Sequence, residues 1–145
     1  MRYDYPIKVS KDEDGRHLVT FPDVPEAADD GATLAEAMIE AEKALLVALQ
    51  YRIKQREPIP RPSTPRRGQR TIALRALPAA KLALYQAMID QGLNTVSLGR
   101  RLAGESETEV RRLLDLSHNS RISYVEAALA VLGQELVVET RKSAA

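Results

Sequence analysis

The sequence predicts an α+β protein of two parts: an N-terminal β-β-β-α-β domain over residues 1–76 and an all-α domain over residues 77–142. Three observations support this prediction. Alternating apolar residues indicate strands near the N-terminus, an apolar stripe with helical spacing follows them, and a proline-rich segment precedes several short helical patterns. We expect the second domain to contain a helix-turn-helix and to end in a short strand.

The first strands are predicted from alternation. Four apolar residues near the N-terminus alternate with polar ones: Tyr3, Tyr5, Ile7 and Val9. Asp14-Gly15 then favours a turn, and a β-prone apolar run resumes at residues 18–21. We therefore expect a β-hairpin, followed by a short third strand around residues 27–29, before Gly31.

A long amphipathic helix is predicted next. Thr33 and Glu36 fit a capping box, in which both side chains accept hydrogen bonds from backbone N–H groups at a helix start. The apolar residues that follow recur at steps of three and four: Leu34, Ala37, Met38, Ala41, Leu45, Ala48, Leu49 and Ile53. A strand is predicted at residues 70–75, and we expect it to return parallel to the hairpin after this crossover helix.

Residues 58–68 form a biased segment. Four of the eight prolines fall here, at positions 58, 60, 62 and 65, and favour extended backbone. Arg66-Arg67-Gly68 adds positive charge, which suits either a nucleic-acid patch or a flexible basic linker. We interpret the segment as a linker.

The last third of the chain is predicted to be helical. Pro78 suits the first turn of a helix that Gly92 ends in a left-handed conformation. Further helices are expected at residues 95–103, 107–116 and 123–132, the last of them ended by Gly133. A short terminal strand is expected at residues 136–138.

Two of these helices could form a helix-turn-helix. Apolar residues allow them to pack across a turn at residues 102–106, and Ser106 with Glu109 fits a capping box at the start of the second helix. The candidate DNA-binding residues are Thr95, Arg100, Arg101, Ser106, Thr108, Arg111, Arg112 and His118. Arginines on the second helix suit guanine edges or phosphates, and those on the first suit phosphates. An ordinary four-helix bundle with solvated arginines fits the same pattern, and Glu105, Glu107 and Glu109 would repel phosphates.

Composition limits the function classes. The chain of 145 residues has no cysteine, which excludes a disulfide framework and cysteine-ligated metals. His17 and His118 are far apart, which argues against a two-histidine metal site, and we expect no metal or cofactor. No apolar stretch reaches the length of a signal peptide or a membrane span, so a cytoplasmic protein is expected.

The charges are segregated along the chain. Residues 1–57 carry 8 basic and 12 acidic side chains, residues 58–76 carry 5 arginines and no acid, and residues 77–145 carry 8 of each sign. The negative charge of the first segment would complement a basic partner.

Four blocks resemble HicB antitoxins. DGRHLVTFPDVP at residues 14–25 and DGATLAEA at residues 30–37 resemble two motifs of this family, and LPAAKLALY at 77–85 and RRLLDLSH at 111–118 are similar to its branch with a Cro-like helix-turn-helix. The chain departs from the family at Glu26-Ala27, where Gly-Cys is common, at Gly99, where a small alanine is usual, and in a turn one residue longer.

The resemblance implies a partial ribonuclease-H-like N-terminal fold that occludes a small RNA-cleaving HicA-type toxin, and repression of the shared operon. The candidate toxin-binding residues are Phe21, Asp23, Glu26, Asp29 and Asp30. A homodimer is expected, because operator half-sites are read by paired units and the terminal strand offers a pairing edge.

Three other functions fit parts of the sequence. A stand-alone helix-turn-helix regulator with a sensing N-terminal domain needs no toxin. A residual nuclease would depend on Asp4, Asp23 or Asp29, yet Asp4 has no acidic companion in its strand to help it hold magnesium. A ribbon-helix-helix protein could use residues 70–75 as its ribbon, but this leaves residues 104–140 unexplained. We expect a binding protein, not an enzyme.

Overall fold

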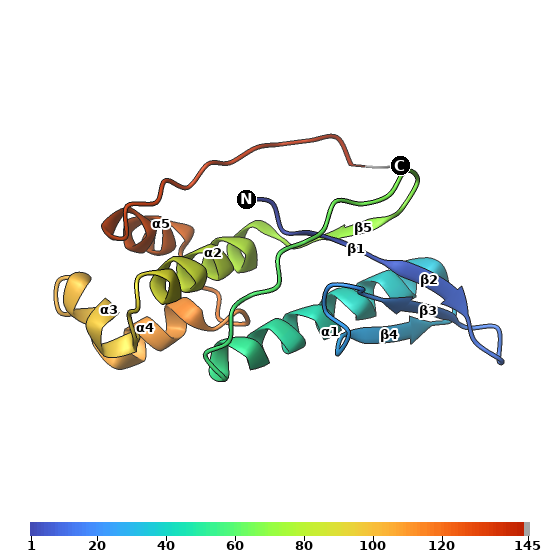
Figure 1. The fold of residues 1–145 in the computed structure, drawn as a ribbon, viewed down its shortest axis with the longest axis horizontal. Coiled ribbons are helices and arrows are strands. Elements are labelled where there is room, and N and C mark those ends of the chain that lie inside the picture. Colours follow the sequence, from blue (N-terminus) through green and yellow to red (C-terminus); the bar gives the residue numbers. More distant parts are fainter. Residues whose placement is uncertain (144–145) are drawn as a thin grey trace.

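The structure is a computed structural model that describes residues 1–143 and is mixed α+β, as predicted (Figure 1). Its elements in chain order are β1 (Asp4–Pro6), β2 (Lys8–Lys11), β3 (His17–Thr20), β4 (Ala28–Gly31), α1 (Leu34–Lys54), β5 (Thr71–Ala73), α2 (Ala76–Asp90), α3 (Thr95–Arg101), α4 (Glu107–Leu114) and α5 (Ile122–Val131). The sheet lies at one end of the molecule and helices α3 to α5 at the other, while α1 and α2 run between the ends.

Strands β2, β3 and β4 form an antiparallel sheet in that order. The predicted hairpin is confirmed, with Val9 opposite Val19 and Gly15 in a left-handed conformation at its turn. The third strand is also confirmed, at Ala28–Gly31. A Cβ at Gly31 would lie 2.5 Å from the backbone nitrogen of Ala37, so only glycine lets β4 approach the start of α1 this closely.

The predicted first strand is split between two sheets. β1 pairs with β5, Tyr5 lying opposite Ile72, while β2 pairs with β3. The break follows Pro6, which has no N–H group to donate to a ladder. β5 runs antiparallel to β1, so the predicted parallel return is wrong. The reason is that the segment after α1 runs back past β1 and then reverses in a turn at residues 66–69, where Gly68 is left-handed, so that β5 runs against β1 (Figure 1).

Helix α1 connects the two ends of the molecule. Thr33 Oγ1 accepts a hydrogen bond from the N–H of Glu36 at 3.2 Å, which fixes its start, but within residues 1–143 the Glu36 carboxylate does not form the second bond of the predicted capping box. The predicted stripe is largely buried, at Ala37, Ala41, Leu45, Ala48, Leu49 and Ile53. At 1.5 Å per residue, a helix of 21 residues is about 31 Å long, whereas a four-residue strand spans about 13 Å. The end of α1 therefore projects beyond the sheet.

Residues 58–70, here called the strap, include the predicted linker and are anchored to the rest of the chain at several points. Tyr5 donates its hydroxyl to the carbonyl of Pro60 at 2.8 Å, and Ile59 is buried. Asp23 accepts two hydrogen bonds from Ser63, at 2.9 and 3.0 Å. Proline content predicted the extended backbone correctly, but these long-range contacts hold it in place.

The predicted helices of the last third are confirmed, within a few residues. Gly92 and Gly133 end α2 and α5 as predicted, and both are left-handed, which was expected of Gly92. Buried side chains of both ends belong to one hydrophobic cluster, and Tyr85 of α2 donates its hydroxyl to the carbonyl of Glu57 at 2.7 Å. The two predicted domains thus share a core.

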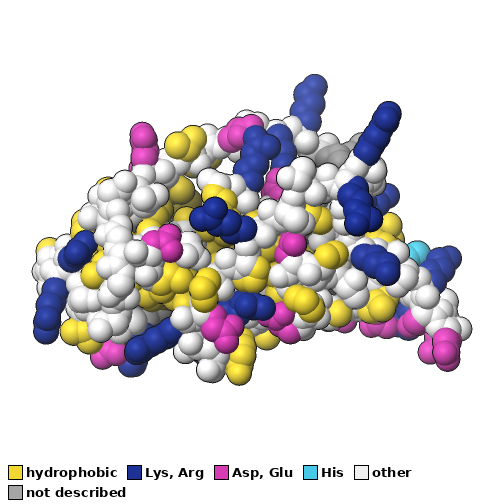
Figure 2. Space-filling view, viewed as in Figure 1, with side chains coloured by type: hydrophobic (Ala, Val, Ile, Leu, Met, Phe, Trp, Pro, Cys, Tyr) yellow, Lys and Arg dark blue, Asp and Glu magenta, His cyan; other side chains and the backbone are white. Residues whose placement is uncertain are grey.

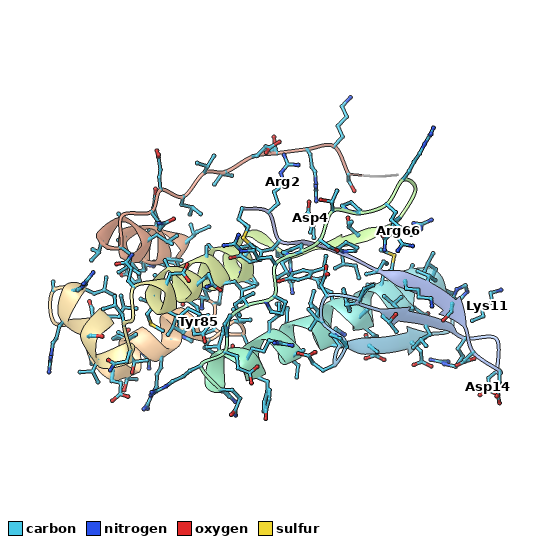
Figure 3. The ribbon with its side chains drawn as sticks, viewed as in Figure 1. Arg2, Asp4, Lys11, Asp14, Arg66 and Tyr85 are labelled. Atoms are coloured by element: carbon cyan, nitrogen blue, oxygen red, sulfur yellow. The ribbon has the colours of Figure 1, made fainter. Side chains whose placement is uncertain are left out.

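The predicted terminal strand is absent. Residues 134–143 are extended but form no ladder, and Val137 and Val138 are 78% and 74% exposed. Two ion pairs hold this tail against β1: Arg2 with Glu139 at 2.7 Å, and Arg141 with Asp4 at 2.8 Å. Figure 3 shows Arg2 and Asp4 pointing toward the tail. Ion pairs between side chains fix its course without the backbone pairing of a strand.

Gly99 fits the long turn between α3 and α4. A Cβ at this position would lie 2.5 Å from the carbonyl oxygen of Glu105, and the Gly99 carbonyl accepts a hydrogen bond from the N–H of Gly104 at 3.1 Å. Ala103 and Gly104 both have positive φ, which brings the turn back against α3. The longer turn therefore packs closely against α3 only because residue 99 is a glycine.

We predict that Gly99→Ala destabilises the chain by about 1–3 kcal/mol, although alanine is the better helix former, because the added methyl group would overlap a carbonyl oxygen. Ala103→Gly is the matched change in the same turn and should stabilise by up to about 1 kcal/mol, because it relieves a left-handed alanine. Urea unfolding measures both. A Gly99→Ala protein as stable as the wild type would contradict the close approach.

Candidate functional site

Helix α4 presents the candidate nucleic-acid surface. Ser106 Oγ accepts a hydrogen bond from the N–H of Glu109 at 3.2 Å and fixes the helix start, while the Glu109 carboxylate pairs with Arg112 instead of completing the predicted capping box. Val110, Leu113 and Leu114 are buried, and this leaves Thr108, Arg111 and Arg112 exposed, as expected. The capped helix therefore carries its polar residues outward.

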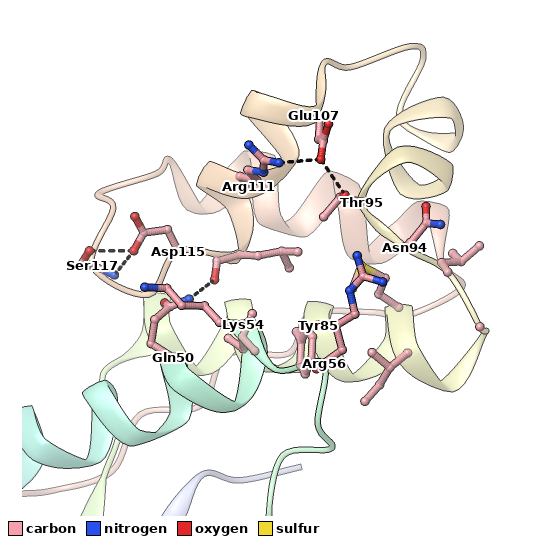
Figure 4. A pocket seen from close by; sticks show the side chains of 16 residues that line it. Gln50, Lys54, Arg56, Tyr85, Asn94, Thr95, Glu107, Arg111, Asp115 and Ser117 are labelled. Atoms are coloured by element: carbon pink, nitrogen blue, oxygen red, sulfur yellow. Dashed lines mark hydrogen bonds and ion pairs between the residues drawn. The ribbon is translucent and has the colours of Figure 1, made fainter.

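One side of α4 faces the end of α1. Arg111 pairs with Glu107 at 2.8 Å, and Thr95 Oγ1 lies 3.4 Å from the same carboxylate. These side chains line a pocket of about 920 Å³ together with Gln50, Lys54 and Arg56 (Figure 4). The structure thus brings the predicted residues Thr95 and Arg111 together.

The other side of α4 faces α5. Arg112 pairs with Glu109 at 2.7 Å and lines a second hollow, of about 520 Å³, with Arg101, His118 and Tyr124. Arg101 donates to Gln91 Oε1 at 3.1 Å. The adjacent residues Arg111 and Arg112 therefore border opposite sides of the same exposed face, as expected of residues about 100° apart on a helix.

The remaining predicted residues are more scattered. Arg100 is exposed on α3 and lines neither hollow. His118 Nδ1 lies 3.0 Å from Ser120 Oγ, in the loop after α4. Three glutamates remain near the start of α4, and two of them are neutralised by the arginines one turn further on.

The sequence prediction missed Lys81, whose side chain is 0% exposed on α2. Its ammonium group donates to the carbonyls of Arg112, Asp115 and His118 at 2.9, 2.7 and 2.7 Å. Burial lowers the pKa of Lys81, and the carboxylate of Asp115 opposes this shift. Carbonyls at a helix C-terminus lack intrahelical donors, so the buried cation holds the end of α4 and the loop that follows. A lysine between Ala80 and Leu82 in an apolar stretch was the available signal.

Gln50 was also missed. Its side-chain oxygen accepts from the N–H of Leu116 at 2.7 Å, and its side-chain nitrogen lies 3.4 Å from the carbonyl of Leu114. These bonds connect α1 to the end of α4. Polar residues of this type on a helix face are too common for the sequence to single out.

The predicted partner-binding residues divide into buried and exposed ones. Phe21 is 1% exposed and packs in the core, so in this structure its ring offers almost no surface to a partner. Its apolar ring completes the core of the sheet-and-helix unit. Asp23 holds the strap through Ser63. Glu26 is exposed and accepts a hydrogen bond from Arg52 at 2.7 Å, which lowers the pKa of the Glu26 carboxyl.

The last two predicted partner-binding residues lie on β4. Asp30 pairs with Arg16 at 2.7 Å, and this hydrogen bond lowers the pKa of its carboxyl. Asp29 Oδ1 accepts from the N–H of Asp30. Figure 2 shows acidic side chains gathered over β4 and the hairpin tip, on the opposite edge from the Lys and Arg side chains over the strap and tail. These carboxylates form an acidic edge far from α4.

The carboxylates proposed for a nuclease are engaged separately. Asp4 pairs with Arg141, whereas Asp23 binds Ser63. Within residues 1–143, no group of three or more histidine, aspartate or glutamate side chains is placed to hold a metal ion. In the same range, no helix is long and apolar enough to cross a membrane.

The fold and its two surfaces define an α+β protein in which an acidic sheet-and-helix unit shares its core with a set of short helices. The profile of the family described as "HicB_like antitoxin of bacterial toxin-antitoxin system" matches residues 4–83. The chain belongs to this family of antitoxins.

Its relatives match nearly the whole chain. Antitoxin HicB 2 of Photorhabdus laumondii is 37% identical over 132 residues, which cover 91% of this chain and 92% of the relative. Antitoxin HicB of Escherichia coli strain K12 is 35% identical over 132 residues, or 91% and 95% of the two chains. Antitoxin HicB of Pseudomonas fluorescens is 32% identical over 137 residues, or 94% and 92%. The similarity thus includes the helices that follow residue 83.

Proposed function

We propose that this antitoxin binds and occludes a small RNA-cleaving toxin of the HicA type and represses its own operon by binding operator DNA. It acts by binding and not by catalysis. The observation that supports this most strongly is the similarity to HicB antitoxins, which covers both the sheet and the helices that follow residue 83. The acidic edge and α4 lie far apart in the molecule. Two partners could therefore be bound at once.

The acidic edge suits the toxin. A protein that binds RNA is generally basic, and residues 1–57 carry four more acidic than basic side chains. Asp29 and Asp30 on this edge are held by neighbouring groups, so the edge is ordered before a partner arrives. Asp23 and Glu26 are held as well, by Ser63 of the strap and by Arg52 in the last turn of α1. Charge complementarity of this kind mainly accelerates association.

We predict that Asp29→Lys combined with Asp30→Lys slows association with the toxin by about tenfold or more at low salt, because it reverses the charge of the edge. The matched control is Glu126→Lys on α5, which is exposed but remote from β4. Surface plasmon resonance with a catalytically inactive toxin measures the rate. Equal rates for both variants would show that the toxin binds elsewhere.

The pair α3 and α4 suits DNA. We propose that they form a helix-turn-helix in which α4 enters the major groove, with Thr108 and Arg111 or Arg112 at base edges and Arg100 and Arg101 near phosphates. The division of the chain into a toxin-binding part at residues 1–76 and a DNA-binding part at residues 77–142 follows from this assignment.

We predict that Arg111→Ala and Arg112→Ala each weaken operator binding while leaving toxin binding intact. Loss of a guanine contact should cost about 1–3 kcal/mol and relax specificity at one position, whereas loss of a phosphate contact should weaken binding to all sequences. Operator titrations at several salt concentrations distinguish the two. Wild-type affinity in both variants would rule out this face, and DNA binding without any toxin binding would favour a stand-alone regulator.

An operator read by paired helices requires two copies of the chain, so we propose a homodimer. The tail contributes no strand to such a dimer in the present structure. Ile122, Tyr124 and Val131 on α5 are exposed and apolar, and they offer a surface for the second copy.

A further inference from the structure

The pocket between α1 and α4 has two walls that come from segments far apart in the sequence. Arg111, Glu107 and Thr95 form one wall, and Lys54 and Arg56 at the end of α1 form the other. Figure 4 shows Lys54 and Arg56 extending from α1 toward the helices that carry Arg111 and Thr95. A duplex that contacts Arg111 therefore passes beside the end of α1.

Lys54 and Arg56 differ from the arginines of α4 in having no partner. Both are exposed, and among residues 1–143 neither forms an ion pair or a side-chain hydrogen bond. By contrast, Arg111 is paired with Glu107, and Arg52 on the same helix is paired with Glu26. The end of α1 thus presents two unneutralised positive charges at the rim of this pocket.

Arg56 also occupies a position that glycine would fill at lower cost. Its φ is 58°, in the left-handed region, and its N–H bonds to the carbonyl of Ile53 as the helix ends. A left-handed residue other than glycine is strained, and such strain is typical of functional positions.

We propose that Lys54 and Arg56 contact the phosphate backbone of the operator duplex, so that the toxin-binding part of the chain takes part directly in DNA binding. This rests on the proposed operator binding and extends its surface from α3 and α4 to α1. A duplex is the partner whose dense negative charge matches two exposed cations beside a candidate reading helix. Gln50 holds α1 against the end of α4, which fixes the two walls relative to each other.

The test uses the full chain and a duplex from the DNA directly upstream of its gene, at salt concentrations from about 50 to 200 mM. The variant combines Lys54→Ala with Arg56→Gly. Its slope of log affinity against log salt should become shallower by about 1.8, and its affinity at about 0.1 M salt should fall tenfold or more. Preference for the operator over a random duplex should stay unchanged, because phosphates carry no sequence information directly.

Two control variants distinguish the loss of a specific phosphate contact from unfolding and from a general loss of positive charge. Arg56→Gly should raise the stability to urea while it weakens DNA binding. Arg66→Ala with Arg67→Ala removes the same charge from the strap, at the far end from Tyr85 and the pocket, and should leave the slope unchanged (Figure 3). A wild-type slope in the Lys54/Arg56 variant overturns this inference alone. A wild-type chain that binds no duplex at any salt concentration overturns operator binding and this inference together.

Discussion

The buried ammonium group of Lys81 is the constraint on which the end of the molecule that carries α4 depends. A charged group taken out of water is costly unless hydrogen bonds compensate for the lost hydration. Three carbonyls provide that compensation, and all three belong to the end of α4 or to the loop after it. Each of these carbonyls also accepts a hydrogen bond from a backbone N–H, so the ammonium group adds a charged donor to carbonyls of the helix end and its loop. One cation on α2 therefore determines where α4 ends and how it is oriented.

The length of α1 connects this end to the sheet. Because the helix is longer than the strands that it covers, its last turns lie beside α2 and α4, where Gln50 bonds to the end of α4. The strap then returns along α1, held by Tyr5 and by Asp23. Folding of the acidic unit and placement of α4 are thus linked through one core.

The fold was largely predictable from local signals. The Thr33 and Ser106 caps and the glycines after α2 and α5 act within a few residues, so the sequence shows them directly. The predictions failed where contacts between residues distant in the sequence determine the structure. The partner of β5, the anchored strap and the course of the tail depend on residues dozens of positions away.

The candidate sites show the same difference between local features, which the sequence predicts, and long-range contacts, which it does not. Exposure of Arg111 and Arg112 followed from helix periodicity, whereas burial of Phe21 did not follow from its motif. The resemblance led us to expect an alanine at position 99, and the close approach of the turn explains why glycine stands there. Lys54 and Arg56 gained significance only when the structure placed them opposite Arg111.

Urea unfolding of Lys81→Met tests this account most directly, because methionine matches the length of the chain but has no donors. We predict a loss of about 3 kcal/mol, since three carbonyls would each lose the hydrogen bond that they accept from a charged donor. Lys43→Met, at an exposed surface pair with Glu40, is the control and should change stability by less than about 1 kcal/mol. A Lys81→Met protein as stable as this control would contradict the claim that the buried cation holds α4 in place.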